Sequence, residues 1–159
     1  MKFKSEKEYA DFLTEGMLRS VLESFSYKDI DLVTFVPMSR KSERKRGFNQ
    51  SKLLAEKLAK KLFLPCEDTL VKIRETSNQH KLSREMRREN IKDAFALKNN
   101  ADIKGKTVLI CDDIKTTGST LLACEKALLN GGAKDVYCVV VALPVYGSAD
   151  RLDKDQKNI

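Results

Sequence analysis

Two adjacent carboxylates, Asp112 and Asp113, separate an apolar run from a stretch of small hydroxyl residues. The sequence VLICDDIKTTGST over residues 108–120 is typical of a buried strand, a loop and the start of a helix. In an open α/β sheet, ligands bind beyond the carboxyl ends of the strands, where this loop would lie. Backbone N–H groups at a helix start favour an anion, and Gly118 lets the backbone approach it closely. These residue types therefore predict an anion site beside two carboxylates.

The two carboxylates restrict the ligand to one that carries hydroxyl groups as well as a phosphate. Carboxylates accept hydrogen bonds from a sugar diol, or help to hold a hydrated Mg²⁺. A ribose 5-phosphate satisfies the whole stretch. The plain alternative is an acidic turn followed by a Thr/Ser helix cap, and we favour the ligand site because all its parts occur in one unbroken order. The P-loop pattern Gly-x-x-x-x-Gly-Lys-Ser/Thr is absent from the sequence.

The elements that must position this site follow from the hydrophobic pattern. We expect helices over residues 5–24, 51–62 and 118–130, and strands over residues 32–36, 70–73, 94–97, 107–111 and 136–142. Ser5 would be the N-cap of the first helix, with Glu8 reaching back in a capping box. The alternation predicts an α/β fold, a mainly parallel twisted sheet flanked by helices. We expect one domain over residues 1–146 and a polar tail over residues 147–159.

The composition is that of an ordinary globular protein, with 42% apolar and 33% charged residues among 159. The 30 Lys and Arg residues against 23 Asp and Glu give a net charge of +7, which suits nucleic acid or a small polyphosphate equally. The longest apolar runs, residues 108–111 and 136–143, fall far short of the ~20 residues that span a bilayer. No secretory signal opens the sequence, and the four cysteines form no Cys-x-x-Cys pair. We therefore expect a cytoplasmic protein with reduced cysteines and no membrane partner.

The stretch over residues 108–120 closely resembles the phosphoribosyl pyrophosphate (PRPP) signature of type I phosphoribosyltransferases: an apolar strand, two acids, an apolar residue and a Thr-Thr-Gly-Ser-Thr loop. The resemblance implies that Asp112 and Asp113 hold the ribose hydroxyls at the catalytic centre. It also implies that a loop wraps the 5-phosphate of PRPP, formed by Thr116, Thr117, Gly118, Ser119 and Thr120.

Two further blocks resemble the ComF family of competence-associated proteins within this superfamily. The first is VPMSRKSERKRGFNQ over residues 36–50, which ends in that family's Arg-Gly-Phe-Asn-Gln. The second is a set of residues at the spacing of the family's middle motif, and its members are Arg74, Thr76, Gln79, Leu82, Arg87, Asn90, Ala94 and Phe95. The three blocks together cover most of residues 32–143, so the resemblance implies a type I phosphoribosyltransferase-like fold with a flexible hairpin over the active site.

The first basic block follows a predicted strand end, where a loop would meet the pyrophosphate of PRPP. The resemblance puts the pyrophosphate loop at Met38, Ser39, Arg40 and Lys41. Arg44 and Arg46 are further candidates for neutralising the leaving group, since arginine makes bidentate contacts with phosphate oxygens. The alternative is a solvated basic turn before a helix.

The middle block, residues 74–93, resembles the hairpin that closes over the active site of type I enzymes and excludes water from the reactive ribosyl centre. Arg74, Arg84 and Arg87 are its basic candidates. Arg84, Arg87 and Arg88 would share one helical face, which would meet PRPP, a nucleic acid or nothing. The sequence leaves these three possibilities open.

The sequence departs from the family patterns in two places. ComF proteins often carry an N-terminal cysteine-rich zinc module, which is absent here, and the chain starts nearly inside its first predicted helix. We therefore expect either a missing upstream strand or a shortened N-terminus. Purine-type relatives often place an acid where Thr116 stands, so the acceptor base or nucleophile stays unidentified.

The leading hypothesis is a ComF-like protein that binds Mg²⁺·PRPP and transfers the phosphoribosyl group to an acceptor, releasing pyrophosphate. Mg²⁺ is the expected cofactor, and a homodimer is implied because type I relatives are commonly dimers. The alternative is a non-catalytic PRPP or nucleotide sensor, or a factor that handles single-stranded DNA in competence and DNA uptake. A response-regulator-like receiver is excluded, because receivers place the acidic pair after the first strand and here the pair comes late.

Overall fold

The computed structural model describes residues 2–24, 27–74, 93–114 and 118–142. Its elements in chain order are α1 (Lys2–Ser24), the short 3-10 helix η1 (Tyr27–Asp29), β1 (Leu32–Phe35), α2 (Arg40–Arg46), α3 (Gln50–Leu62), β2 (Leu70–Lys72), β3 (Phe95–Leu97), β4 (Thr107–Ile114), α5 (Ser119–Asn130) and β5 (Asp135–Ala142). The predicted polar tail over residues 147–159 lies outside the described residues.

The main sheet has the strand order β1-β4-β5, and both pairings are parallel. Strand β4 lies in the middle, with Val108 opposite Leu32 on one side and Val136 on the other. Cys66 forms an isolated parallel bridge with Val33, so the backbone at Cys66 lies beside β1. The predicted α/β fold with a mainly parallel sheet is confirmed.

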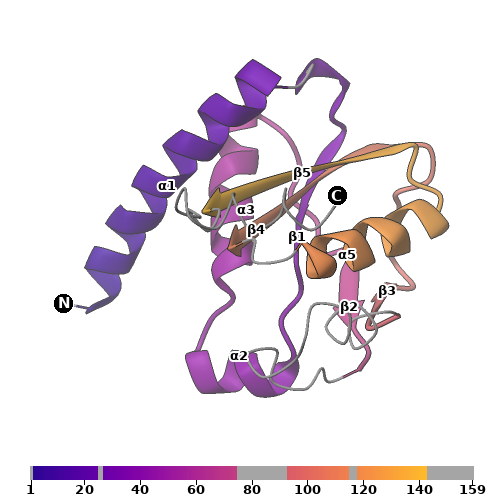
Figure 1. Cartoon of the computed structure of the whole chain (residues 1–159). Helices are drawn as coiled ribbons and strands as arrows, with labels where there is room; N and C mark the ends of the chain where they lie inside the picture. Colours follow the sequence, from indigo (N-terminus) through magenta and orange to yellow (C-terminus); the bar gives the residue numbers. More distant parts are fainter. Residues whose placement is uncertain (1, 25–26, 75–92, 115–117, 143–159) are drawn as a thin grey trace, which may run out of the picture.

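Helices cover both faces of this sheet (Figure 1). Alternate residues of β4 serve the two layers: Leu109 packs in the cluster under α1 and α3, and Ile110 in the cluster under α5. Both side chains are fully buried, as are Leu58 of α3 and Leu128 of α5. Burial on both faces explains why the strand is continuously apolar up to its carboxylates.

Strands β2 and β3 form a separate antiparallel pair, with Leu70 opposite Leu97, that packs against α5. These are the two arms of the predicted hairpin, and its intervening residues 75–92 lie outside the described part of the chain. Buried hydroxyls join the pair to the main sheet, because Thr34 Oγ1 lies 2.8 Å from Thr69 Oγ1 and donates to the carbonyl of Glu67 at 2.9 Å.

Three expectations about element bounds are wrong. The first helix begins at Lys2, so Ser5 lies inside it and is not its N-cap; no Gly or Pro stops the helix upstream of Ser5. Residues 40–46 are helical where a loop was expected. Strand β4 continues through both carboxylates to Ile114, because its pairing with β5 runs on to Ala142.

All four cysteines are free thiols. The apolar pattern predicts that Cys111, Cys124 and Cys138 are core residues; Cys111 and Cys124 are buried, whereas Cys138 is only partly buried. No helix in the described ranges combines the length and the apolar character that crossing a bilayer requires.

Candidate functional site

The carboxyl ends of β1 and β4 meet at one edge of the sheet. The Val36 N–H donates to the carbonyl of Cys111 at 3.0 Å, which extends the β1-β4 contact one residue past the end of β1. Residues 37–39 leave the sheet at this point, beside Asp112 and Asp113. The topology therefore brings the predicted pyrophosphate segment and the predicted ribose carboxylates together, although some 70 residues of sequence separate them.

A pocket of about 170 Å³ lies at this edge. Its lining comes from the β1–α2 connection, α2, α3, the β2-β3 pair, β4 and α5: Val36, Pro37, Met38, Ser39, Ser42, Asn49, Ser51, Lys72, Phe95, Asp112, Asp113 and Thr120. We call it the acidic pocket, because the described part of its lining holds two carboxylates and one cation.

Asp112 is the buried carboxylate of the acidic pocket, with 8% of its surface exposed. Its Oδ1 accepts hydrogen bonds from Ser51 Oγ and from the Asp113 N–H, each at 2.9 Å. Burial raises the pKa of the Asp112 carboxyl to about 7, and the charge of Asp113 adds to the rise, while the Ser51 hydrogen bond lowers it. A charged Asp112 is therefore costly near neutral pH, and a ligand that brings hydroxyl donors or a cation would relieve that cost.

The Arg-Gly-Phe-Asn-Gln signature forms the connection between α2 and α3. Gly47 ends α2 with φ 87°, a left-handed conformation that favours glycine. Asn49 caps α3: its Oδ1 accepts from the Lys52 N–H at 3.3 Å, and its Nδ2 donates to the carbonyl of Val36 at 3.1 Å. Asn49 thereby fastens the end of β1 to the helix that carries Ser51 to Asp112.

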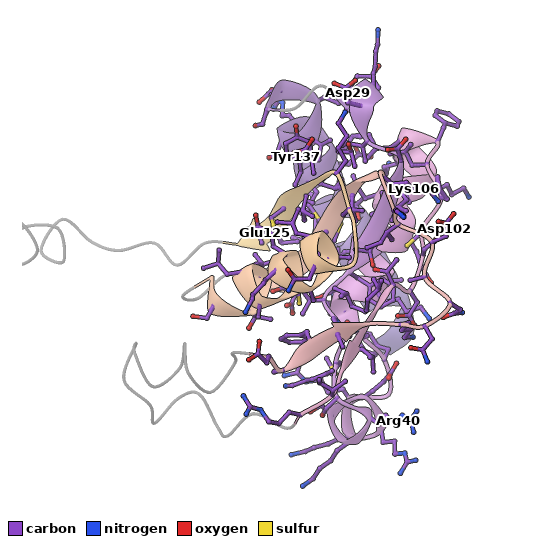
Figure 2. The ribbon with its side chains drawn as sticks, turned by 90° about the vertical axis from the view of Figure 1, so that its right-hand side faces the viewer. Asp29, Arg40, Asp102, Lys106, Glu125 and Tyr137 are labelled. Atoms are coloured by element: carbon purple, nitrogen blue, oxygen red, sulfur yellow. The ribbon has the colours of Figure 1, made fainter. Side chains whose placement is uncertain are left out.

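The predicted pyrophosphate loop is half loop and half helix. Met38 and Ser39 line the acidic pocket, and the Oγ of Ser39 caps α2 by accepting from the Ser42 N–H at 3.2 Å. Arg40 and Lys41 form the first turn of α2. Arg40 lies with α2 at one end of the molecule, and Asp29 lies at the opposite end (Figure 2). The remaining α2 candidates, Lys41, Arg44 and Arg46, are exposed and do not line the acidic pocket.

The predicted 5-phosphate loop is described only in its second half. Gly118 has φ 74° and precedes the first turn of α5, in which Ser119 is buried and Thr120 lines the acidic pocket. Thr116 and Thr117 lie outside the described residues. So do Arg84 and Arg87 of the middle block, whereas Arg74 is described and lines a second pocket.

The second pocket has a volume of about 430 Å³ and adjoins the first across residues 37–39. We call it the basic pocket. It is lined by Phe35, Pro37, Met38, Ser39, Arg40, Glu43, Asn49, Lys52, Asp68, Leu70, Val71, Lys72, Ile73, Arg74 and Lys98. Lys72 lines both pockets, and its Nζ lies 6.0 Å from the centroid of the Phe95 ring.

Sequence reasoning missed several side chains that line the acidic pocket, among them Asn49, Ser51 and Lys72. Asn49 could have been found as a helix N-cap, since asparagine directly precedes an amphipathic run. Lys72 could have been found because it is a charged residue in an otherwise apolar predicted strand. Ser51 has no local signal, because its partner Asp112 is 61 positions away.

The acidic pocket fits a magnesium ion that is shared with a ligand. No group of three or more His, Cys, Asp or Glu side chains occurs within the described ranges, so these ranges hold no cage made by protein alone. Mg²⁺ commonly takes one or two carboxylates and completes its shell with water and substrate phosphates. Asp112 and Asp113 are oxygen donors of that kind.

Comparison with known proteins places this chain in a family. Residues 49–159 match the phosphoribosyl transferase domain. The chain is 34% identical over 147 residues to DNA utilization protein YhgH of Escherichia coli O157:H7, covering 87% of this chain and 63% of that protein. It is 30% identical over 133 residues to competence protein ComFC of Bacillus subtilis, covering 82% of this chain and 51% of that protein.

The chain thus spans about half to two thirds of these relatives' length. Among solved structures, the fold resembles a purine phosphoribosyltransferase from Pyrococcus horikoshii with a TM-score of 0.53 at 16% identity, covering 87% of this chain and 76% of the other. At that identity the likeness concerns the fold alone. The domain match and the relatives together show that this chain belongs to the phosphoribosyl transferase domain family, as a ComF-type member.

Proposed function

We propose that this protein binds Mg²⁺·PRPP in the acidic pocket and transfers the phosphoribosyl group to an acceptor. The observation that carries the proposal is the convergence of Asp112 and Asp113 with Thr120 and residues 37–39 in one pocket. These are the groups that the ribose, the 5-phosphate and the pyrophosphate of PRPP each require.

In this proposal the ribose hydroxyls of PRPP donate hydrogen bonds to Asp112 and Asp113. Ser51 holds one oxygen of Asp112 at 2.9 Å, and Asn49 ties the end of β1 to the same helix. The carboxylate is thus oriented before the ligand arrives, which lowers the entropy lost on binding. Ser119 and Thr120, in the first turn of α5, stand where the 5-phosphate would meet N–H and hydroxyl donors.

The reaction proposed is a displacement at C1 of the ribose. The bond from C1 to the pyrophosphate oxygen breaks, the pyrophosphate leaves with the electron pair, and a bond forms between C1 and the acceptor, whose proton is lost to solvent. Bound Mg²⁺ would neutralise charge on the departing pyrophosphate. Cationic side chains near residues 37–39, Lys72 and Arg40 among them, would stabilise the same charge.

A release assay for pyrophosphate, run with Mg²⁺·PRPP and a panel of purine and pyrimidine acceptors, tests the proposal. We expect release that depends on one acceptor class and is lost in Asp112→Asn/Asp113→Asn. The matched control is Asp29→Asn/Asp135→Asn, which removes two exposed carboxylates far from the pocket lining and should keep wild-type release. PRPP binding without release for any acceptor would contradict catalysis and favour a sensor that uses the same pocket.

A further inference from the structure

The exposed face of α5 is a feature that the proposed function does not use. Leu122 and Leu129 of this helix are 57% and 43% exposed. Residues seven positions apart lie on the same side of a helix, so the two leucines form one apolar stripe. Helix α5 packs against β5, the strand at one end of the main sheet, and Figure 2 shows both elements at one face of the molecule, with Glu125 on α5.

The other face of the sheet shows how helices can cover one another. There α1 and α3 pack together, and two ion pairs join them, Asp11 with Lys57 and Glu15 with Lys61. On the opposite face, α5 is the one helix within the described ranges that contributes to the hydrophobic cluster. The described part of the chain therefore places no second helix beside the leucine stripe.

Charge and spacing make this stripe complementary to itself. Glu125 and Lys126 lie midway between Leu122 and Leu129, so two leucines flank two opposite charges at equal spacing. If two copies of α5 pack antiparallel about a two-fold axis, Leu122 of each copy meets Leu129 of the other. Glu125 of each copy then meets Lys126 of the other. A two-fold interface requires a surface that is complementary to itself in this way.

Existing contacts leave these two charges available to a second copy. Lys126 Nζ lies 3.4 Å from Asp93, but the two side chains are 59% and 71% exposed, and such an exposed pair contributes little to stability. None of the ion pairs within the described ranges includes Glu125. Neither Glu125 nor Lys126 has a charged residue three or four positions away on α5, so no pair within the helix competes.

We propose that α5 is the interface between two copies of this chain, packed antiparallel about a two-fold axis. The leucines supply the apolar contact, and the pairs of Glu125 with Lys126 fix the direction of packing. A parallel arrangement would set each residue opposite its own copy, so like charges would meet. The interface does not depend on the proposed PRPP site, because none of its four residues lines the acidic pocket.

Sedimentation velocity of the full chain tests the proposal. A contact made by one helix stripe is small, so we expect a monomer–dimer equilibrium with a dissociation constant in the micromolar range. Protein at up to about 100 μM populates such a dimer. Leu122→Gln/Leu129→Gln should weaken association at least about tenfold. The matched control Phe12→Gln/Leu22→Gln removes two apolar side chains of α1 that are 75% and 47% exposed, and should associate as the wild type does.

An exchange of the two charges makes the test specific to the antiparallel arrangement. Glu125→Lys alone and Lys126→Glu alone each place like charges opposite each other, so each should weaken association at least about tenfold. Glu125→Lys/Lys126→Glu restores opposite charges in both pairs and should recover wild-type association, which separates repulsion from misfolding. The proposal is overturned by a wild type that stays monomeric, by equal weakening in the α1 control, or by a double charge variant that associates no better than the single ones.

Discussion

The acidic and basic pockets share residues 37–39, Asn49 and Lys72, yet they carry opposite charge. The acidic pocket holds two carboxylates, several hydroxyls and one cation, a set suited to a sugar diol and a metal ion. The described lining of the basic pocket holds five cations and two carboxylates, a set suited to phosphates. One short connection after β1 therefore separates two pockets of different chemistry.

The two pockets also differ in how their charges are held. Asp112 is 8% exposed on a buried strand, where a charge is costly unless a ligand compensates it. The side chains of Lys52 and Lys98 are 46% and 33% exposed, so their charged ends remain partly hydrated. Burial of Asp112 therefore costs stability in the acidic pocket, whereas Lys52 and Lys98 keep part of their hydration.

Of the substitutions considered, replacing Asp112 by asparagine should change the free energy of unfolding the most. Because the folded-state pKa of about 7 lies above the ordinary 3.8, the folded protein binds more protons than the unfolded chain between these values. The free energy of unfolding therefore falls as pH rises from about 4 to about 7, and the loss is complete above that range. Asp112→Asn should raise the free energy of unfolding at pH about 8 by up to about 4 kcal/mol.

Urea denaturation of the empty protein at pH about 5 and about 8 checks this, since the wild type should lose stability across the interval and Asp112→Asn should not. Asp29→Asn, at an exposed site in η1, is the control and should keep the wild-type pH dependence. This account of the acidic pocket is contradicted if the stability of Asp112→Asn depends on pH as that of the wild type does.

Asn49 belongs to both pockets, so its loss should affect both. Asn49→Ala removes the cap of α3 and the 3.1 Å bond to Val36, and we expect a loss of about 2 kcal/mol in the free energy of unfolding. Thermal denaturation measures the loss, with the exposed Asn100→Ala as a neutral control. A purely local role is indicated instead if the variant binds Mg²⁺·PRPP with wild-type affinity.

Among the described residues, Lys72 is the one cation that lines both pockets. Lys72→Met keeps much of the apolar stem and removes the charge, so the affinity for Mg²⁺·PRPP should fall about tenfold, or about 1.4 kcal/mol. Calorimetric titration of the variant measures the fall, with exposed Lys60→Met as the control. Wild-type affinity would place Lys72 outside the PRPP site and assign it to the basic pocket alone.

Ser51 should have the smallest effect, and only at the acidic pocket. Its hydrogen bond lowers the pKa of Asp112, so Ser51→Ala should raise that pKa, and the rise should be small because water replaces part of the lost bond. The pH midpoint of Mg²⁺·PRPP binding should move upward with it. A midpoint that moves downward would contradict this role.

The parts of the site that can be predicted from the sequence are those at strand ends. Asp112 and Asp113 could be predicted because they follow a buried apolar run, and ligands gather at the carboxyl edge of a parallel sheet. The helix over residues 40–46 was missed because its charged residues show no apolar stripe, although its caps, Ser39 and Gly47, are visible in the sequence.

The remaining parts depend on contacts between distant segments. Ser51 reaches Asp112 across 61 positions, and Lys72 reaches the same pocket because the β2-β3 pair packs against α5. No local pattern encodes either approach. The basic pocket likewise exists only once α2, α3 and β2 are assembled, so its charge could be counted in the sequence but not located.

The measurement that tests the central claim most directly is a calorimetric titration of Mg²⁺·PRPP into the wild type, Asp112→Asn/Asp113→Asn and the Asp29→Asn/Asp135→Asn control. The account predicts saturable binding at one site in the wild type and the control, and none in the Asp112/Asp113 variant. Saturating ligand, at about 100 times Kd, should also stabilise the wild type by about 2.7 kcal/mol. Equal binding by all three proteins would contradict the assignment of Asp112 and Asp113 to the ribose.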